Sequence, residues 1–151
     1  DALGIILDNR LRQTLREALR GTYGVSIDAG ASKVPVPRYS VSIEFGCDPE
    51  RAEELVKTVL REVEALRTTG PTEREVADAR EALLRGHESD LAQNANLAGQ
   101  ISDRYENGED VANFFGLPNE YRRLAAALLQ ETARGILDTG NYVQVILFPE
   151  K

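Results

Sequence analysis

The sequence predicts an α+β fold, a two-layer domain in which helices pack on one face of a mainly antiparallel sheet. Three observations predict it. Leucines recur every four positions at the start of the chain, two later segments alternate apolar and polar residues, and a near-continuous apolar run follows several helical patterns. The order strand, strand, helices, strand, with a hairpin-type connection between the first two strands, favours helices gathered on one side of the sheet.

The first helix is predicted from the spacing of its leucines. Positions four apart stack along one face of a helix, and the five that do so here are Leu3, Leu7, Leu11, Leu15 and Leu19. Nothing resembling an N-cap precedes them. We therefore expect the domain to be truncated at its N-terminus, with residues upstream of Asp1 in the parent protein.

Two strands are predicted next, over residues 22–29 and 38–45. In the first, Tyr23, Val25 and Ile27 alternate with small residues, as is typical of a half-buried strand. Residues 30–37 are predicted to be a loop, because the prolines in it cannot donate to a sheet ladder. The second strand should turn one set of residues toward the helices, namely Tyr39, Val41, Ile43 and Phe45.

The middle of the chain carries clear helix starts. Asp48 can cap a helix whose first turn holds Pro49 and Glu50, and helical spacing continues to about Arg67. After Gly70 and Pro71, the pattern Thr72-x-x-Glu75 is a capping box. It predicts a long helix toward Asn94.

The last third has a weaker pattern. We expect a helix through Ile101 and Tyr105, a break at Asn107-Gly108, and a short turn around Phe114-Phe115. Pro118 and Asn119 are predicted to open a final helix that ends near Asp138. The apolar run 142–148 then reads as a strand, central or buried on both faces, that shares the sheet with the first two.

Composition excludes several classes of function. With 151 residues the chain is expected to form a single α+β domain, residues 1–151, with one core. Its net charge of −7, with basic residues scattered among acids, offers no basic face for phosphates, so nucleic acid is not expected as a partner. No apolar run approaches the roughly 20 residues that span a bilayer, so no membrane span is expected.

Metal chemistry is not expected within this chain. Its single histidine, His87, and single cysteine, Cys47, leave no His/Cys cluster for zinc. His87 is predicted to be a solvated residue late in a charged helix, and Cys47 a small, partly buried structural thiol. No glycine-rich phosphate-binding loop occurs either.

A resemblance rests on an ordered series of short motifs. The segment Leu15-Arg16-Glu17-Ala18-Leu19-Arg20-Gly21-Thr22-Tyr23-Gly24-Val25-Ser26 resembles the Leu-Arg-Glu…Gly-x-Tyr-x-Val segment of the second-type domain in pitrilysin/insulinase-like zinc metallopeptidases. The likeness extends to Leu7-Asp8-Asn9-Arg10-Leu11, to Phe45-x-Cys47-Asp48-Pro49-Glu50 and to Gly70-Pro71-Thr72-x-x-Glu75. It covers about the first two thirds of the chain, and the rest agrees in element order.

The resemblance implies a division of labour. Members of that family pair a zinc domain bearing His-x-x-Glu-His with a similarly folded domain lacking it, and enclose a peptide substrate between them. By this likeness the chain is the non-zinc domain of a multi-domain zinc endopeptidase. It should close the chamber and orient peptide substrate, while zinc is the cofactor of a partner domain in the same polypeptide or a paired subunit. The chain alone should be inactive.

Two residues carry the implied substrate contact. In the family an arginine ending the long helix and a tyrosine opening the next strand help hold the reacting carbonyl, and here those positions are Arg16 and Tyr23. Guanidinium and phenol groups can both donate to such an oxygen. The alternative is structural, with Arg16 capping helix carbonyls and Tyr23 packed on the core. Arg20 stands where members often have glycine.

Other functions stay open. Some relatives have lost activity, so the parent could be an inactive structural or peptide-binding subunit, and a stand-alone α+β module is a third interpretation. A His-x-x-Glu-His motif upstream would favour the peptidase. A periplasmic or cell-envelope location follows from the family analogy alone.

Overall fold

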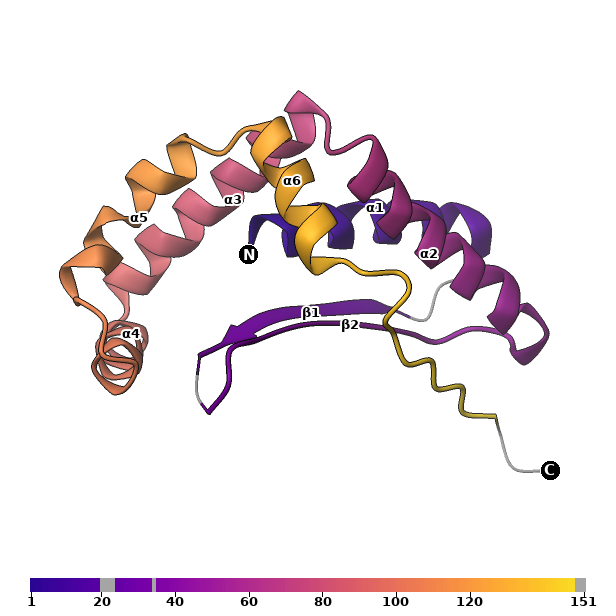
Figure 1. The fold of residues 1–151 in the computed structure, drawn as a ribbon, viewed down its shortest axis with the longest axis horizontal. Helices are drawn as coiled ribbons and strands as arrows, with labels where there is room; N and C mark the ends of the chain where they lie inside the picture. The colour runs from indigo at the N-terminus through magenta and orange to yellow at the C-terminus, as the bar shows by residue number, and fades with distance from the viewer. Residues whose placement is uncertain (20–23, 34, 149–151) are drawn as a thin grey trace.

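The computed structural model describes residues 1–19, 24–33 and 35–148, and the side chains of all of these except residues 17–19. Over this part of the chain, six α-helices form an arch above one face of a two-stranded sheet and past one of its ends (Figure 1), so the predicted α+β class is confirmed. The elements are α1 (Ala2–Leu19), β1 (Val25–Ser32), β2 (Arg38–Phe45), the 3₁₀ helix η1 (Pro49–Arg51), α2 (Ala52–Thr68), α3 (Glu73–Ala92), α4 (Asn94–Glu106), α5 (Ala112–Arg122) and α6 (Ala126–Ile136).

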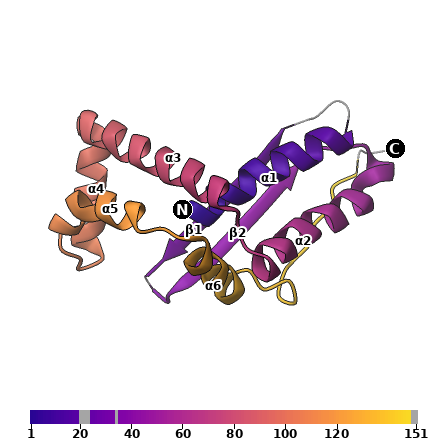
Figure 2. The same cartoon turned by 90° about the horizontal axis from the view of Figure 1, so that it is seen from above.

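Helix α1 is the centre of the packing. It contacts β1, α2, α3 and α6, and it lies across the sheet when the molecule is seen from above (Figure 2). Leu3, Leu7, Leu11 and Leu15 are buried as predicted, the last two fully, while the side chain of Leu19 lies outside the described part of the chain. Leucines and valines from the other elements join it in one core, which includes Leu55, Val59, Leu66, Val76 and Leu129. Burial of this stripe therefore holds the two layers together.

The sheet is an antiparallel hairpin whose register pairs Val25 with Phe45 and Ser32 with Arg38. Its apolar face packs on the core through Val25, Ile27, Val41, Ile43 and Phe45, as the alternation predicted. The other face, which carries Ser26, Asp28, Ser42 and Glu44, is exposed.

Two details of the hairpin differ from the prediction. β1 extends to Ser32, beyond the predicted end at Ala29, because Gly30 and the two small residues after it still pair with β2. Tyr39 was placed with the core-facing residues but is 70% exposed, since it pairs with Ala31 close to the turn. Thr22 and Tyr23 lie outside the described residues.

The two predicted helix starts, at Asp48 and at Thr72, both form. Asp48 accepts a hydrogen bond from the Glu50 amide at 3.0 Å and caps η1. The Thr72 hydroxyl accepts from the Glu75 amide at 3.2 Å, and the Glu75 carboxylate accepts from the Thr72 amide at 2.7 Å. Gly70 has a φ of 82°, a conformation that glycine adopts without strain, so the chain can reverse tightly at the junction between α2 and α3.

Arg10 fastens this junction to α1. Its guanidinium donates to both carboxylate oxygens of Glu75, with the Nη2–Oε2 bond at 2.8 Å, and to the Gly70 carbonyl oxygen at 3.1 Å. Arg10 and Glu75 are both largely buried. One arginine thus links residues that are 65 positions apart, and we call Arg10, Gly70 and Glu75 the junction clamp.

The junction clamp makes stability depend on acidity. The hydrogen bond from Arg10, followed by bonds from the Thr72 amide and hydroxyl, lowers the pKa of Glu75 from 4.5 to about 2, although burial opposes the shift. A carboxyl whose pKa is lower in the folded state stabilises the fold above its unfolded value. That contribution is lost as the pH falls from about 4.5 to about 2.

We therefore expect Glu75→Gln, which can retain the capping geometry, to cost about 1.5 kcal/mol of unfolding free energy at pH 7. The difference from wild type should shrink as the pH falls from 4.5 toward 2. Urea unfolding at several pH values measures it. Glu81→Gln is the control, since Glu81 forms an exposed pair with Arg85. A difference that stays constant across that pH range would contradict the assignment.

The last helices differ from the prediction. The expected turn at Phe114-Phe115 lies inside α5, Pro118 is within that helix rather than at its start, and a separate helix begins at Ala126. Phe114 is 2% exposed, and burying a side chain of this size stabilises α5. The burial offsets the cost of about 3 kcal/mol that an interior proline brings.

The predicted third strand is wrong for this structure. Residues 142–148 form neither helix nor strand and pair with no strand that the structure describes, and the sheet contains β1 and β2. Val143 and Leu147 are 90% and 91% exposed rather than buried. The uncharged residues, several of them β-branched, favour a strand. A strand also needs the edge of a neighbouring strand with which its backbone can form hydrogen bonds. Figure 1 shows the segment leaving the layers near the end of β2.

Candidate functional site

Arg16 lies in the last turn of α1, at the end of the sheet where β1 begins and β2 ends (Figure 1). Its side chain is exposed. Among the described residues, none forms a hydrogen bond or ion pair with its guanidinium, so this arginine caps no helix carbonyl there. As far as the described residues go, its donors are left for other partners. Tyr23, the other predicted contact, lies outside the described residues, so its convergence with Arg16 stays a prediction.

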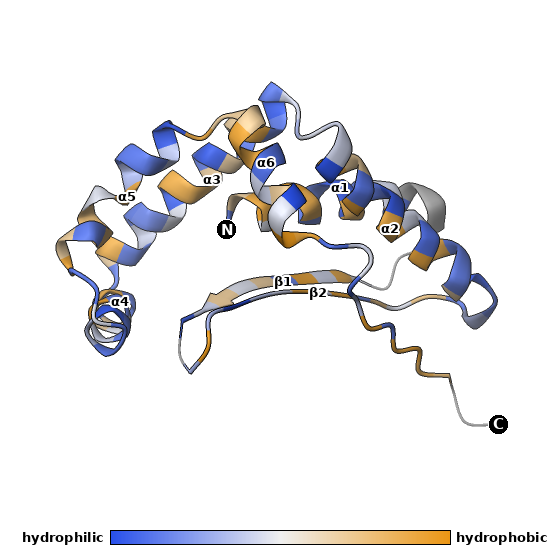
Figure 3. Ribbon diagram, in the orientation of Figure 1, coloured by the Kyte–Doolittle hydropathy of each residue, from blue (hydrophilic) through white to orange (hydrophobic). Residues whose placement is uncertain are grey.

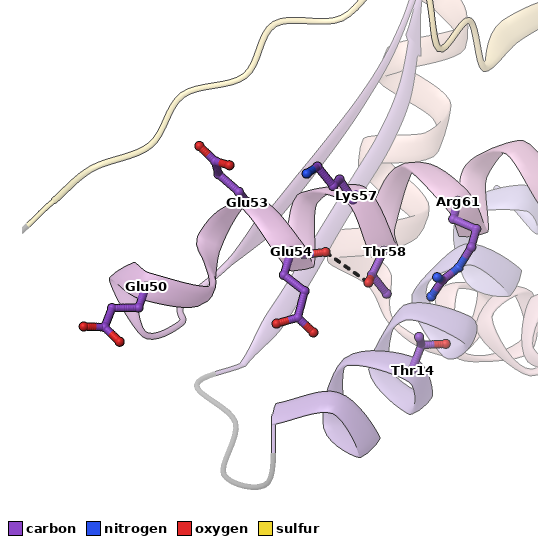
Figure 4. Close-up of a pocket in the computed structure, with 7 residues that line it drawn as sticks. All are labelled: Thr14, Glu50, Glu53, Glu54, Lys57, Thr58 and Arg61. Carbon is purple, nitrogen blue, oxygen red and sulfur yellow. Dashed lines mark hydrogen bonds between the residues drawn. The ribbon is translucent and has the colours of Figure 1, made fainter.

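A shallow groove opens between α1 and the start of α2 at the same end of the molecule (Figure 4). It measures about 600 Å³ and is lined by Thr14, Glu50, Glu53, Glu54, Lys57, Thr58 and Arg61. The Thr58 hydroxyl donates to the Glu54 carbonyl oxygen at 3.1 Å, within one turn of α2. Negatively charged carboxylates and positively charged lysine and arginine side chains line the groove side by side. This mixture does not single out one charged ligand.

Candidate metal ligands are scattered in the structure. Within residues 1–19, 24–33 and 35–148, no three His, Cys, Asp or Glu side chains gather closely enough to hold a metal ion. Several of the described carboxylates instead pair with arginines, as Glu64 does with Arg67 at 2.6 Å and Glu81 with Arg85. Pairs within one helix, such as these two, are typical of helix faces that contact solvent.

His87 was predicted to be solvated, and that prediction is wrong. The side chain is 5% exposed and packs against the Phe114 ring at 4.7 Å and the Tyr121 ring at 6.4 Å between centroids. Arg104 lies 5.0 Å above Phe114, and burial raises the pKa of the Tyr121 phenol. His87 thus joins α3 to α5 in a second, smaller core. The sequence concealed this because acidic and basic residues flank His87 on exposed positions of the same helix.

The imidazole ring of His87 contributes to packing, and one of its two nitrogens forms no hydrogen bond among the described atoms. That nitrogen is Nδ1, which is buried. We expect His87→Ala to cost about 2 kcal/mol through the cavity it leaves, and His87→Phe to stay within about 1 kcal/mol of wild type. Urea unfolding at neutral pH measures both. If His87→Phe were as destabilised as His87→Ala, the ring nitrogens would matter more than ring volume.

Cys47 behaves as predicted. It lies between β2 and η1, is half-buried, and packs against the main core.

None of the described helices is long and apolar enough to cross a bilayer.

Comparison with known proteins identifies the family. A family model described as "Peptidase M16 inactive domain" matches residues 1–83, more than half of the 151 residues. The chain belongs to this family. The match includes the Arg16–Tyr23 segment and the junction clamp, so the resemblance to pitrilysin/insulinase-like peptidases is confirmed.

A curated relative from Arabidopsis thaliana, named "Zinc protease PQQL-like", is 27% identical over 165 residues. The alignment covers 99% of this chain but 17% of that relative. The chain therefore spans about one sixth of the length of the zinc protease it matches.

Solved structures show the same fold. The periplasmic protease PqqL of Escherichia coli superposes with a TM-score of 0.75 at 21% identity, over 89% of this chain and 15% of that one. A protease from Helicobacter pylori gives 0.76 at 18% identity, over 91% and 34%. An inactive peptidase domain from Bordetella parapertussis gives 0.76 at 17% identity, over 100% and 83%. At these identities the likeness establishes the fold.

The structure separates the motif residues into two groups. Arg10, Gly70 and Glu75, which come from two distant motifs, meet in the junction clamp and hold the fold. Arg16 instead points to solvent from the end of α1. Sequence reasoning missed the role of Arg10, although its place beside the buried Leu7 and Leu11, in a motif shared with the family, was a usable signal.

Proposed function

We propose that this chain is the non-zinc domain of a zinc-dependent endopeptidase. It closes the chamber and orients peptide for hydrolysis by a zinc-binding domain of the same polypeptide or of a paired subunit. The observation that carries the proposal is Arg16, an exposed arginine at the end of α1 in a member of the inactive-domain family. An arginine in this position, free of other described partners, can bind a ligand without breaking contacts that hold the fold.

The proposed contribution of this chain is positioning. Zinc in the partner domain, when bound, supplies an activated water molecule. Arg16 then binds a carbonyl oxygen of the peptide through a charge-assisted hydrogen bond. The phenol of Tyr23 donates a hydrogen bond to the oxygen on which negative charge develops during attack. The exposed polar face of the sheet, with Ser26, Asp28 and Ser42, offers further hydrogen-bonding groups to an extended peptide.

The Arg16 contact predicts a change in substrate binding. In the longer polypeptide, we expect Arg16→Ala to raise KM for a peptide about 5-fold to 10-fold with kcat little changed, because a contact present in both ground and transition states is lost. Steady-state hydrolysis of a labelled peptide measures it.

Arg12→Ala is the matched control for that experiment. Arg12 lies on the same helix but pairs with Asp8 at 2.6 Å, and its replacement should leave KM unchanged. If both substitutions changed KM equally, Arg16 would have no specific contact with the substrate.

A second candidate function is an inactive structural or peptide-binding subunit. The family description, an inactive domain, is compatible with it. The sequence of the longer polypeptide distinguishes the two, because the peptidase needs a His-x-x-Glu-His motif in its partner domain.

A further inference from the structure

The segment Tyr142–Phe148 exposes more apolar surface than any other stretch of the described chain. It holds five of the eleven large apolar side chains that are exposed among the described residues, namely Tyr142, Val143, Val145, Leu147 and Phe148. Figure 3 shows it as a mostly hydrophobic run outside the layers. Scattered exposed apolar residues are ordinary, but a contiguous run of this kind marks an interaction surface.

The backbone of the segment is also without partners. Among the described residues, none forms a backbone hydrogen bond with the stretch from Tyr142 to Phe148. Three of its seven residues, Val143, Val145 and Ile146, are β-branched, and none is charged. If the segment forms a strand, Val143, Val145 and Leu147 share one face, and Tyr142, Ile146 and Phe148 share the other face with the polar Gln144.

We propose that Tyr142–Phe148 is a strand-pairing segment whose partner is an extended strand of the same longer polypeptide, outside residues 1–151. A strand is the occupant that fits, because it supplies both the backbone hydrogen bonds and an apolar surface for alternate side chains. A helix would satisfy the side chains and leave the amides unpaired.

Covalent linkage favours this partner over a second copy of the chain. The chain covers 17% of its curated relative and 15% and 34% of two solved neighbours, so those proteins carry several times more polypeptide in the same molecule. A tethered strand acts at an effective concentration of the order of millimolar, whereas a second copy competes at its free concentration. An uncharged edge left open would aggregate.

The inference rests on the part of the proposed function that places the chain in a longer polypeptide, and not on peptide binding. Hydrogen–deuterium exchange of that polypeptide tests it. We expect the amides of residues 143–148 to exchange at least 100-fold more slowly than in an unstructured peptide, at every protein concentration between about 1 and 100 μM.

Substitutions sharpen the test. Val145→Pro removes one ladder donor and should raise exchange at its neighbours while the amides of α1 stay protected. Val145→Thr, which retains the β-branch, should leave protection in place. Unprotected amides in the unmodified polypeptide would overturn the inference even if the proline variant failed to fold. Protection that appears only as concentration rises would assign the segment to a second copy and overturn it equally.

Exchange also separates this inference from the proposed function. Arg16→Ala should leave the protection of residues 143–148 unchanged. If the segment is protected and Arg16→Ala hydrolyses peptide with wild-type KM, the role in hydrolysis fails while the strand pairing stands. If KM rises and the segment is unprotected, the reverse holds.

Discussion

Replacing Leu11 with alanine is expected to lower the free energy of unfolding by about 3 kcal/mol. Leu11 is fully buried in the central helix, where α1 packs against β1, α2, α3 and α6. A cavity at this position is surrounded by several elements and cannot be filled by the shift of any one of them. Urea unfolding followed by circular dichroism measures the change.

Leu128→Ala is the matched control. The same atoms are removed from α6, but Leu128 is 51% exposed, so the cost should stay below about 1 kcal/mol. If the two leucines cost the same, the packing described around α1 would be wrong.

The second large effect concerns turnover. In the longer polypeptide, Tyr23→Phe is expected to lower kcat for peptide hydrolysis 10-fold or more, which is about 1.4 kcal/mol of activation free energy. The substitution removes one hydroxyl donor and retains the ring, so the free energy of unfolding should change little. Steady-state kinetics together with thermal unfolding measures both quantities.

Tyr105→Phe provides the comparison, because Tyr105 is 75% exposed on α4 and no role is proposed for it. A Tyr23→Phe enzyme with a wild-type rate would assign Tyr23 to packing in the strand. A loss of stability as large as the loss of rate would lead to the same assignment.

Local signals predicted much of the fold because they depend on near neighbours in the sequence. The capping residues Asp48 and Thr72 act within three positions, and the leucines of α1 repeat every four. The alternation in 38–45 gave the bounds of β2 correctly. Periodicity and capping depend on interactions within a single helical turn or strand. The local sequence is therefore sufficient to predict the elements that they define.

Features that depend on distant partners could not be predicted. The burial of His87 depends on Phe114, whose helix the sequence did not reveal because Pro118 imitates a helix start. The apolar pattern of 142–148 predicts that the segment is covered, but not by which part of the protein. The junction clamp needed Arg10 and Glu75, 65 positions apart, to be placed together.

For the candidate site, residue type suggested the chemistry and the family resemblance supplied the positions. Nothing in the periodicity of α1 distinguishes Arg16 from Arg12. The structure distinguishes them, since Arg12 pairs with Asp8 while Arg16 has no such partner among the described residues. The part of the site that involves Tyr23 stays a prediction.

The measurement that tests the central claim most directly is the rate of peptide hydrolysis, at saturating zinc, by three proteins. These are the longer polypeptide, the same polypeptide with Arg16→Ala and Tyr23→Phe combined, and the chain of residues 1–151 alone. We expect hydrolysis by the first, a kcat/KM at least 10-fold lower for the second, and none by the third. Hydrolysis by residues 1–151 alone, or an unchanged kcat/KM in the double variant, would contradict the account.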